Sequence, residues 1–330
     1  MNKKQKAAFL AAGALTAVSV LLSLCLGAAM LPLGELWDAA LKGPDSTAGF
    51  IFWYSRLPRT AACLLAGAAL SCAGCILQNL LGNQLASPGI IGVNAGAGLA
   101  VTVCGAVGAA SGWGISLSAF VGALGASLLV MGLARKTRAS RSTVILSGVA
   151  VNSILNALRD AVTKLVPDAA MLSSDFRVGD FSSVAIPRLI PAGILILLAL
   201  AAVLTLCNEL DVLALGEDMA QSLGMQVKKV RFLFLLLAAL LAGASVSFAG
   251  LLGFVGLLIP HISRRLVGNE SRYGIPMSIL LGAGFVTASD LVSRMLFIPY
   301  ELPVGILLSI LGGPFFLWLL LKRKGGRQDA

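Results

Sequence analysis

The apolar residues of this chain gather in long blocks, and short charged or turn-rich segments separate the blocks. Most blocks run for about 17 to 25 residues, the length that an α-helix needs to cross a hydrocarbon layer of about 30 Å. They are rich in Leu, Ala and Gly and lack the apolar/polar alternation of membrane strands. The pattern predicts an all-α, polytopic membrane protein, a single transmembrane domain over residues 1–330, with about ten spans near 7–31, 60–82, 90–109, 113–134, 144–166, 189–207, 230–249, 252–267, 275–296 and 303–321.

Two of these blocks are atypical. The first follows Lys3, Lys4 and Lys6 and superficially resembles a signal peptide, but it is longer than the apolar core of about 7 to 15 residues that such peptides have, so we interpret it as a retained span. The eighth block is short and is interrupted by Pro260 and His261. Its boundaries are the least defined of the ten.

Charge predicts the orientation. An even number of spans places both termini on one side, and 17 of the 25 Lys and Arg residues then fall in the segments on that side. Cytoplasmic loops carry such an excess, so both termini are predicted to be cytoplasmic. The net charge of +10 therefore indicates orientation and contact with anionic membrane lipid, and no nucleic-acid partner is expected.

Three connections are too long and polar to be simple turns. The outer connection near 32–59 and the inner segment near 208–229 are candidate docking surfaces for partner proteins. The outer connection near 167–187 is rich in Ser, Asp and Gly and could cover an outer mouth.

Catalytic and metal-binding motifs are missing from the sequence. It contains no phosphate-binding loop of the form GxxxxGK[ST], so this chain is not expected to bind ATP or another cofactor itself. Its one histidine, His261, is remote from the only CxxC pair, Cys72 and Cys75, so neither a metal site nor a membrane enzyme is predicted.

Polar residues recur along one face of the fifth predicted span. Gly148, Asn152, Asn156, Arg159 and Thr163, which we call the polar stripe, are spaced four, four, three and four residues apart. Such a face does not suit lipid. Two readings remain open: hydrogen bonding between packed helices, or the wall of a hydrated pathway.

The inner connection contains a short predicted helix between Gly216 and Gly224, with Glu217 and Asp218 in its first turn, where the helix dipole favours acids. Met219, Ala220 and Leu223 fall on one of its faces. That small apolar face suits insertion into the groove of a partner, or alternatively contact with the membrane surface.

Five ordered motifs together resemble a known family, the permease subunits of binding-protein-dependent importers for iron-siderophore complexes, haem and cobalamin, which are ATP-binding-cassette (ABC) importers. The resemblance runs nearly end to end and is specific because the motifs occur in order. They are RLPRT at 56–60, NQLASPGIIGVNAGA at 83–97, LGEDMAQSLG at 215–224, GFVGLLIPHISR at 253–264 and ELPVG at 301–305.

The resemblance implies a ten-span, non-catalytic subunit in a bacterial cell membrane. It implies pairing with a second permease copy or homologue, two cytoplasmic ATPase subunits that bind ATP and Mg²⁺, and an extracytoplasmic substrate-binding protein. By the same resemblance, residues 213–227 contact the ATPases and the fifth span lines the pathway.

The resemblance also assigns two smaller sites. Ser140, Ser142 and Thr143 would lie near a cytoplasmic gate. Arg56, Arg59 and Arg294 would dock acids of the binding protein, although Asp290, one helical turn before Arg294, is a competing local partner. Anchoring of Arg56 and Arg59 at lipid headgroups is the alternative.

The main alternative function is an ion-coupled secondary transporter. It would need a membrane-embedded acid or a broken-helix ion site. The acids within or near spans, Asp160 and Asp290, lie toward the outer ends beside arginines, which disfavours this alternative. The sequence does not identify the cargo, because selectivity in such importers resides largely in the separate binding protein.

Overall fold

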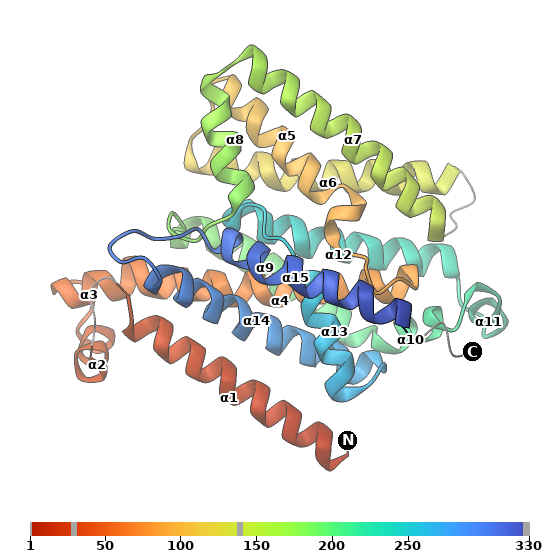
Figure 1. Cartoon of the computed structure of the whole chain (residues 1–330), viewed down its shortest axis with the longest axis horizontal. Helices are drawn as coiled ribbons and strands as arrows, with labels where there is room; N and C mark the ends of the chain where they lie inside the picture. The colour runs from red at the N-terminus through yellow and green to blue at the C-terminus, as the bar shows by residue number, and fades with distance from the viewer. Residues whose placement is uncertain (1, 28–31, 137–140, 326–330) are drawn as a thin grey trace.

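The structure is a computed structural model that describes residues 2–27, 32–136 and 141–325. Over these residues it is a bundle of helices without a β-sheet, which confirms the predicted all-α fold (Figure 1). The helices are α1 (Lys3–Cys25), α2 (Leu33–Lys42), α3 (Thr47–Ile51), η1 (Phe52–Arg56), α4 (Leu57–Leu81), η2 (Pro88–Ile91), α5 (Val93–Ala106), α6 (Gly112–Lys136), α7 (Arg141–Leu165), α8 (Asp168–Val178), α9 (Ile186–Thr205), α10 (Cys207–Ala214), α11 (Glu217–Ser222), α12 (Val227–Ala249), α13 (Val255–Val267), α14 (Ser271–Met295) and α15 (Val304–Gly325).

Each of the ten predicted spans coincides with one of these helices, α1, α4, α5, α6, α7, α9, α12, α13, α14 or α15. Seven helices in the described part are long and apolar enough to cross a membrane. The chain is therefore a membrane protein, while the count of ten spans and the side of the termini stay predictions.

Two predicted spans are shorter than expected. Helix α13 has 13 residues and the α5 helix has 14, each about 20 Å long at 1.5 Å per residue, which is less than the hydrocarbon thickness of about 30 Å. Residues 252–254, predicted as part of the eighth span, are not helical, and Phe254 has a positive φ of 64°. The third span is likewise preceded by the separate turn η2.

The second span is longer than predicted. It begins at Thr47, thirteen residues before the predicted start, because α3, the π-helical turn η1 and α4 form one continuous helix of 35 residues. The predicted outer connection near 32–59 is therefore largely helical. The connections near 167–187 and 208–229 also contain helices, α8 in the first and α10 and α11 in the second.

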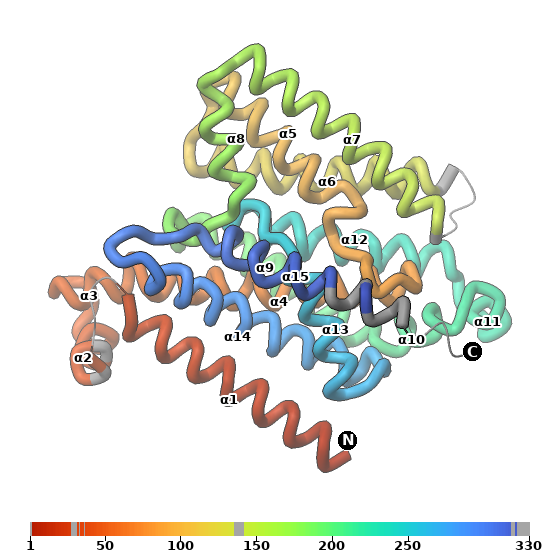
Figure 2. Tube along the Cα trace, viewed as in Figure 1, coloured from red at the N-terminus to blue at the C-terminus, as the bar shows by residue number. Residues whose placement is uncertain are grey.

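Helix α4 is the centre of the bundle and packs against α12, α13 and α14 (Figures 1 and 2). Glycines let these backbones approach closely: a Cβ on Gly67 would lie 2.1 Å from the carbonyl oxygen of Gly282, and one on Gly74 would lie 1.8 Å from that of Gly256. Small residues at helix crossings are the usual means of close packing in membranes. The helices around α4 are thus packed closely through their glycines.

Candidate functional site

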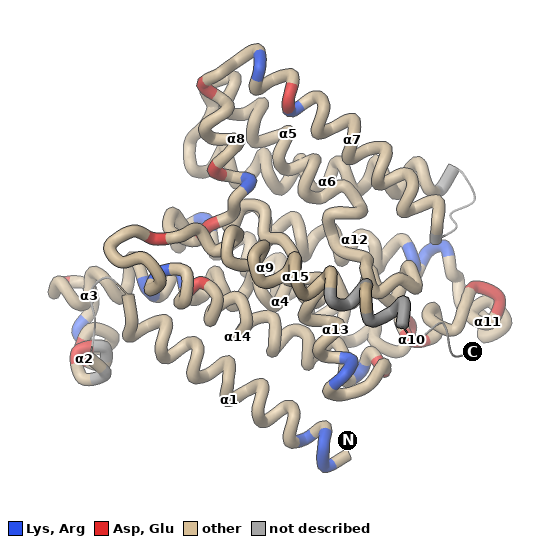
Figure 3. Tube along the Cα trace, in the orientation of Figure 1, with Lys and Arg blue, Asp and Glu red and all other residues tan. Residues whose placement is uncertain are grey.

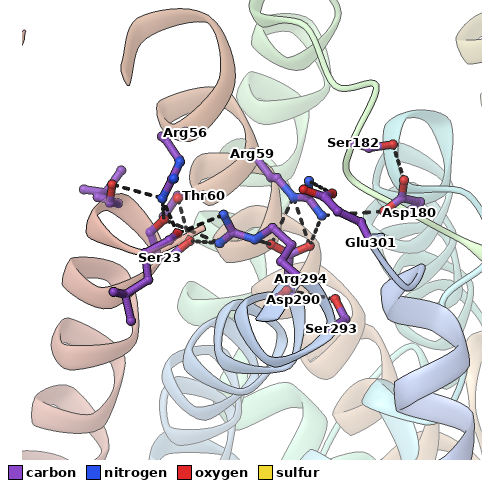
Figure 4. A network of polar contacts seen from close by, with 12 residues as sticks. Ser23, Arg56, Arg59, Thr60, Asp180, Ser182, Asp290, Ser293, Arg294 and Glu301 are labelled. Carbon is purple, nitrogen blue, oxygen red and sulfur yellow. Dashed lines mark hydrogen bonds and ion pairs between the residues drawn. The ribbon is translucent and has the colours of Figure 1, made fainter. Parts of the chain in front are cut away.

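Three buried arginines and their acidic partners form a group at the end of the bundle where α1 and α14 end and α4 begins. We call it the arginine cluster (Figure 4). Arg59 lies at its centre: its Nε and Nη2 donate to the Asp290 carboxylate at 3.0–3.1 Å, and its Nη1 donates to Glu301 Oε2 at 2.6 Å. Asp180 lies farther away, 3.9 Å from Nη2. One guanidinium thus joins α4, α14 and two connecting segments.

The other two arginines join this group to the end of α1. Arg294 lies 3.1 Å from Asp290 Oδ2 through Nε and donates to Ser23 Oγ at 2.9 Å through Nη2. Arg56 donates to backbone carbonyls in the last turn of α1 and just beyond it, those of Ser23, Leu24 and Leu26. Cations are favoured at a helix C-terminus, where carbonyls lack helical partners.

This geometry changes the docking prediction. Arg56, Arg59 and Arg294 are only 4%, 7% and 4% exposed, whereas they were expected on the outer surface. The predicted local pairing of Arg294 with Asp290 is confirmed. Sequence reasoning missed that Asp290 also binds Arg59, from which it is 231 residues distant in the chain. Docking of a partner's acids to these arginines stays a prediction, and it requires them to leave or share their present partners.

The polar stripe of α7 faces the interior of the chain. Asn152 Nδ2 donates to the Gly89 carbonyl in η2 at 2.8 Å, and Gly148 abuts the Ile90 backbone. Arg159 is buried and pairs with Asp160 at 2.8 Å. Gly148 and Asn152 thus pack or hydrogen-bond against another helical segment of the same chain. Lining of a pathway by the stripe, including Asn156 and Thr163, stays a prediction.

The exposed face of α7 is mainly apolar instead. Its large side chains are exposed by 50–81% in the single chain. They are Leu146, Val149, Ile154, Leu158 and Leu165. This face is open to lipid or to another membrane subunit, and it is not the face that the sequence singled out.

The close contact at Gly148 implies that a larger side chain there would lower the stability of the fold. A Cβ at this position would lie 1.9 Å from the Ile90 carbonyl oxygen, so Gly148→Ala should push α7 away from η2 and cost about 1–3 kcal/mol of stability. Gly132→Ala in α6 is the matched control, because nothing lies within 4 Å of its added Cβ. Thermal unfolding of the detergent-solubilised variants measures the difference, and equal melting temperatures would contradict the close contact.

The inner segment is held to the bundle by two carboxylates. Glu217, at the start of α11, pairs with Arg231 of α12 at 2.5 Å. Asp211 of α10 accepts the backbone N–H of Ser271 at 2.9 Å, which caps the first turn of α14. The segment is therefore attached to two long helices rather than lying loose on the surface.

The apolar face of α11 differs from the predicted one. Ala220 is fully buried against the chain's own core, so it cannot contact a partner. Met219 and Leu223 are 58% and 65% exposed, and Leu215, which sequence reasoning left out, is 63% exposed. Met219 and Leu223 are four residues apart and lie on one side of α11, whereas Leu215 precedes the helix across Gly216, whose φ of 113° is not helical. We call the three exposed apolar side chains of this segment, Leu215, Met219 and Leu223, its outward face, and exposed Asp218 flanks them.

The remaining candidate residues are the hydroxyl residues of the predicted gate and the two glycines beside α11. Ser140 lies outside the described residues, whereas Ser142 is exposed and Thr143 is half-buried in the first turn of α7. Gly216 and Gly224 border α11 with positive φ values of 113° and 80°, which suit glycine at the turns on either side. The gate assignment of the hydroxyl residues stays a prediction.

No cluster of three His, Cys, Asp or Glu side chains that could hold a metal occurs in the described part of the chain. The six cysteines are all free, and Cys72 and Cys75 are buried in the core. Buried free cysteines behave as small apolar packing residues.

The described chain is thus a polytopic membrane bundle of long apolar helices, with an ion-pair cluster at one end and a short, partly exposed helix at the other. A comparison with family models identifies the family: residues 15–322 match the FecCD transport family, and the chain belongs to it. It is therefore a permease subunit of ABC importers, and ATP hydrolysis belongs to separate partner subunits.

Individual relatives agree over nearly their whole length. The chain is 34% identical to the iron-uptake system permease protein FeuB of Bacillus subtilis, over 95% of both chains. It is also 34% identical to the vitamin B12 import system permease protein BtuC of Vibrio cholerae, over 92% of both. Among solved structures, a metal-chelate type ABC transporter in an inward-facing conformation superposes with a TM-score of 0.86 at 28% identity, covering 96% of this chain and 99% of that one.

Proposed function

We propose that two copies of this chain, or one copy and a close homologue, form the membrane pathway of an importer for an iron-siderophore-type metal chelate, with haem or cobalamin as the other members of the cargo class. The relatives named for iron and vitamin B12 support this class. The single observation that carries the coupling role is the outward apolar face of α11 on a segment attached to α12 and α14.

Three kinds of partner follow from this proposal. Two cytoplasmic ATPases bind ATP and Mg²⁺ and receive the face of Leu215, Met219 and Leu223. A substrate-binding protein docks at the opposite end, near the arginine cluster. The exposed apolar face of α7 supplies contact area for the second permease, because such a face is otherwise matched only by lipid tails.

The proposed orientation places the α11 end in the cytoplasm. Figure 3 supports it, since basic residues mark the start of α1, the start of α12 and the region where α13 meets α14, all at the same end of the bundle as α11. An excess of Lys and Arg is typical of cytoplasmic loops. Bacterial inner or plasma membrane is the corresponding location.

Uptake by the reconstituted complex tests the proposal. Proteoliposomes that contain the permease with its ATPases are loaded with ATP and Mg²⁺, and binding protein charged with a radiolabelled ferric siderophore, haem or cobalamin is added outside. We expect one cargo class to accumulate only with ATP inside. Accumulation driven by a proton or sodium gradient without ATP would favour the secondary transporter instead.

A further inference from the structure

A cavity of about 440 Å³ opens at the end of the bundle where α6 and α9 begin and α8 and α12 end. Its lining includes two acidic side chains, Asp175 and Asp180, one basic side chain, Arg188, and apolar residues such as Phe248. A second cavity of about 180 Å³ lies between α6, α9 and α12 and shares Ser116, Arg188 and Ser247 with the first. The two therefore adjoin, one charged and one apolar.

The apolar cavity lies along an exposed, apolar surface of α6 and α9. Its lining includes Leu117, Phe120 and Leu195, and Leu117 is 56% exposed. The neighbouring large side chains of the two helices are also exposed, which leaves an apolar surface that lipid tails can cover. They are Val121, Ile190, Ile194, Leu197 and Leu198. Trp113 is 48% exposed beside this cavity, in the first turn of α6, and tryptophan favours the depth of lipid headgroups.

Among the described residues, Arg188 and Asp175 of the first, charged cavity have no partner of opposite charge. Arg188 donates to the Ser183 carbonyl at 3.1 Å but pairs with no carboxylate among the described residues. Its guanidinium lies over Gly112, where an added Cβ would be 3.0 Å from Cζ of Arg188. The absence of a side chain at Gly112 therefore leaves room for the guanidinium. Asp175 is exposed and has no ion pair in the described part of the chain. Asp180 contacts Ser182 and lies 3.9 Å from Arg59.

From this arrangement we infer a binding site for one zwitterionic phosphoethanolamine lipid. The guanidinium of Arg188 binds the phosphate, since guanidinium groups match phosphate oxygens in charge and geometry. The carboxylates of Asp175 and Asp180 face the ammonium, and an acyl chain occupies the groove along Leu117 and Phe120. A lipid with a purely anionic headgroup is disfavoured because its charge would lie beside two carboxylates and a single arginine.

Native mass spectrometry of the full-length chain, purified together with its partner subunits and titrated with defined lipids, tests the site. Wild-type protein is expected to retain 1-palmitoyl-2-oleoyl-phosphatidylethanolamine in preference to the matching phosphatidylglycerol. Arg188→Gln should weaken phosphatidylethanolamine binding about tenfold, which corresponds to about 1.4 kcal/mol. Arg177→Gln is the matched control: Arg177 is an exposed arginine at the end of α8 that does not line either cavity, and its loss should leave binding unchanged.

A second variant tests the ammonium contact independently of Arg188. Asp175→Asn changes an exposed side chain and should shift the preference toward phosphatidylglycerol. Equal losses in Arg188→Gln and Arg177→Gln, or wild-type binding of phosphatidylglycerol as tight as that of phosphatidylethanolamine, would overturn the site. So would a disulfide between two copies carrying Leu117→Cys, because the groove would then belong to a second copy. None of these readouts depends on ATP-driven uptake.

Discussion

Asp290→Ala is expected to destabilise the protein more than any other single change at the arginine cluster. Asp290 is fully buried and is the shared carboxylate of Arg59 and Arg294. Removing it leaves two guanidiniums buried without their main counterion, and removal of one partner from a buried ion pair costs about 3–5 kcal/mol. Thermal unfolding of the purified protein measures the loss.

Glu301→Gln is the control for this experiment. Glu301 binds the same arginine at 2.6 Å, but its side chain is 40% exposed, and exposed ion pairs contribute only about 0–1 kcal/mol. A small effect of Glu301→Gln beside a large effect of Asp290→Ala would identify Asp290 as the centre of the cluster. Equal melting temperatures for the two variants would show that burial does not set the strength of these contacts.

Met219→Arg should abolish coupled uptake while leaving the helix bundle folded. Met219 is 58% exposed in the centre of the outward face of α11, so the change does not disturb the chain's own core. In a packed interface with an ATPase it would bury an unpaired cation at a cost of several kcal/mol, and uptake should fall below about a tenth of the wild-type rate. Uptake and ATPase activity in proteoliposomes, with co-purification of the ATPase, are the measurements.

Gln221→Arg provides the matched control, because Gln221 is an exposed residue of α11 two positions along, on a different face of the helix. It should transport normally. Ala220→Arg would be uninformative by comparison, since Ala220 is buried and the arginine would disrupt the fold itself. If Met219→Arg co-purifies and transports at the wild-type rate, α11 is not the coupling contact, and a position on the membrane surface takes its place.

The sequence was sufficient to predict the class of fold because span length follows from helix rise and bilayer thickness alone. Helix ends were predicted less well where neighbours decide them. Phe52 to Arg56 read as a connection because of their aromatic and charged side chains, yet they continue the second span as a π-helical turn. Likewise α13 stops short of a full span because the preceding backbone turns at Phe254.

In the candidate sites, too, local features were predicted from the sequence, whereas features that depend on neighbouring helices were not. Helical spacing correctly placed the polar residues of α7 on one face, but it could not decide whether that face is turned inward, which depends on η2. The arginines at 56, 59 and 294 were assigned from the family resemblance, whereas their burial depends on contacts distant in sequence, those of Arg59 with Asp290 and of Arg294 with Ser23 at the end of α1. For α11, periodicity alone could not tell that Ala220 faces the core.

Helix α14 connects the two ends of the molecule as a single rod. Its first N–H, at Ser271, is bound to Asp211 of the inner segment, and Asp290 on the same helix binds Arg59 at the other end. Nineteen residues of α-helix separate the two points, about 28 Å at 1.5 Å per residue. A helix resists compression along its axis. A displacement of α10 therefore pushes on the same helix that Arg59 holds through Asp290. While both contacts hold, α10 and Arg59 cannot move independently of each other along the axis of α14.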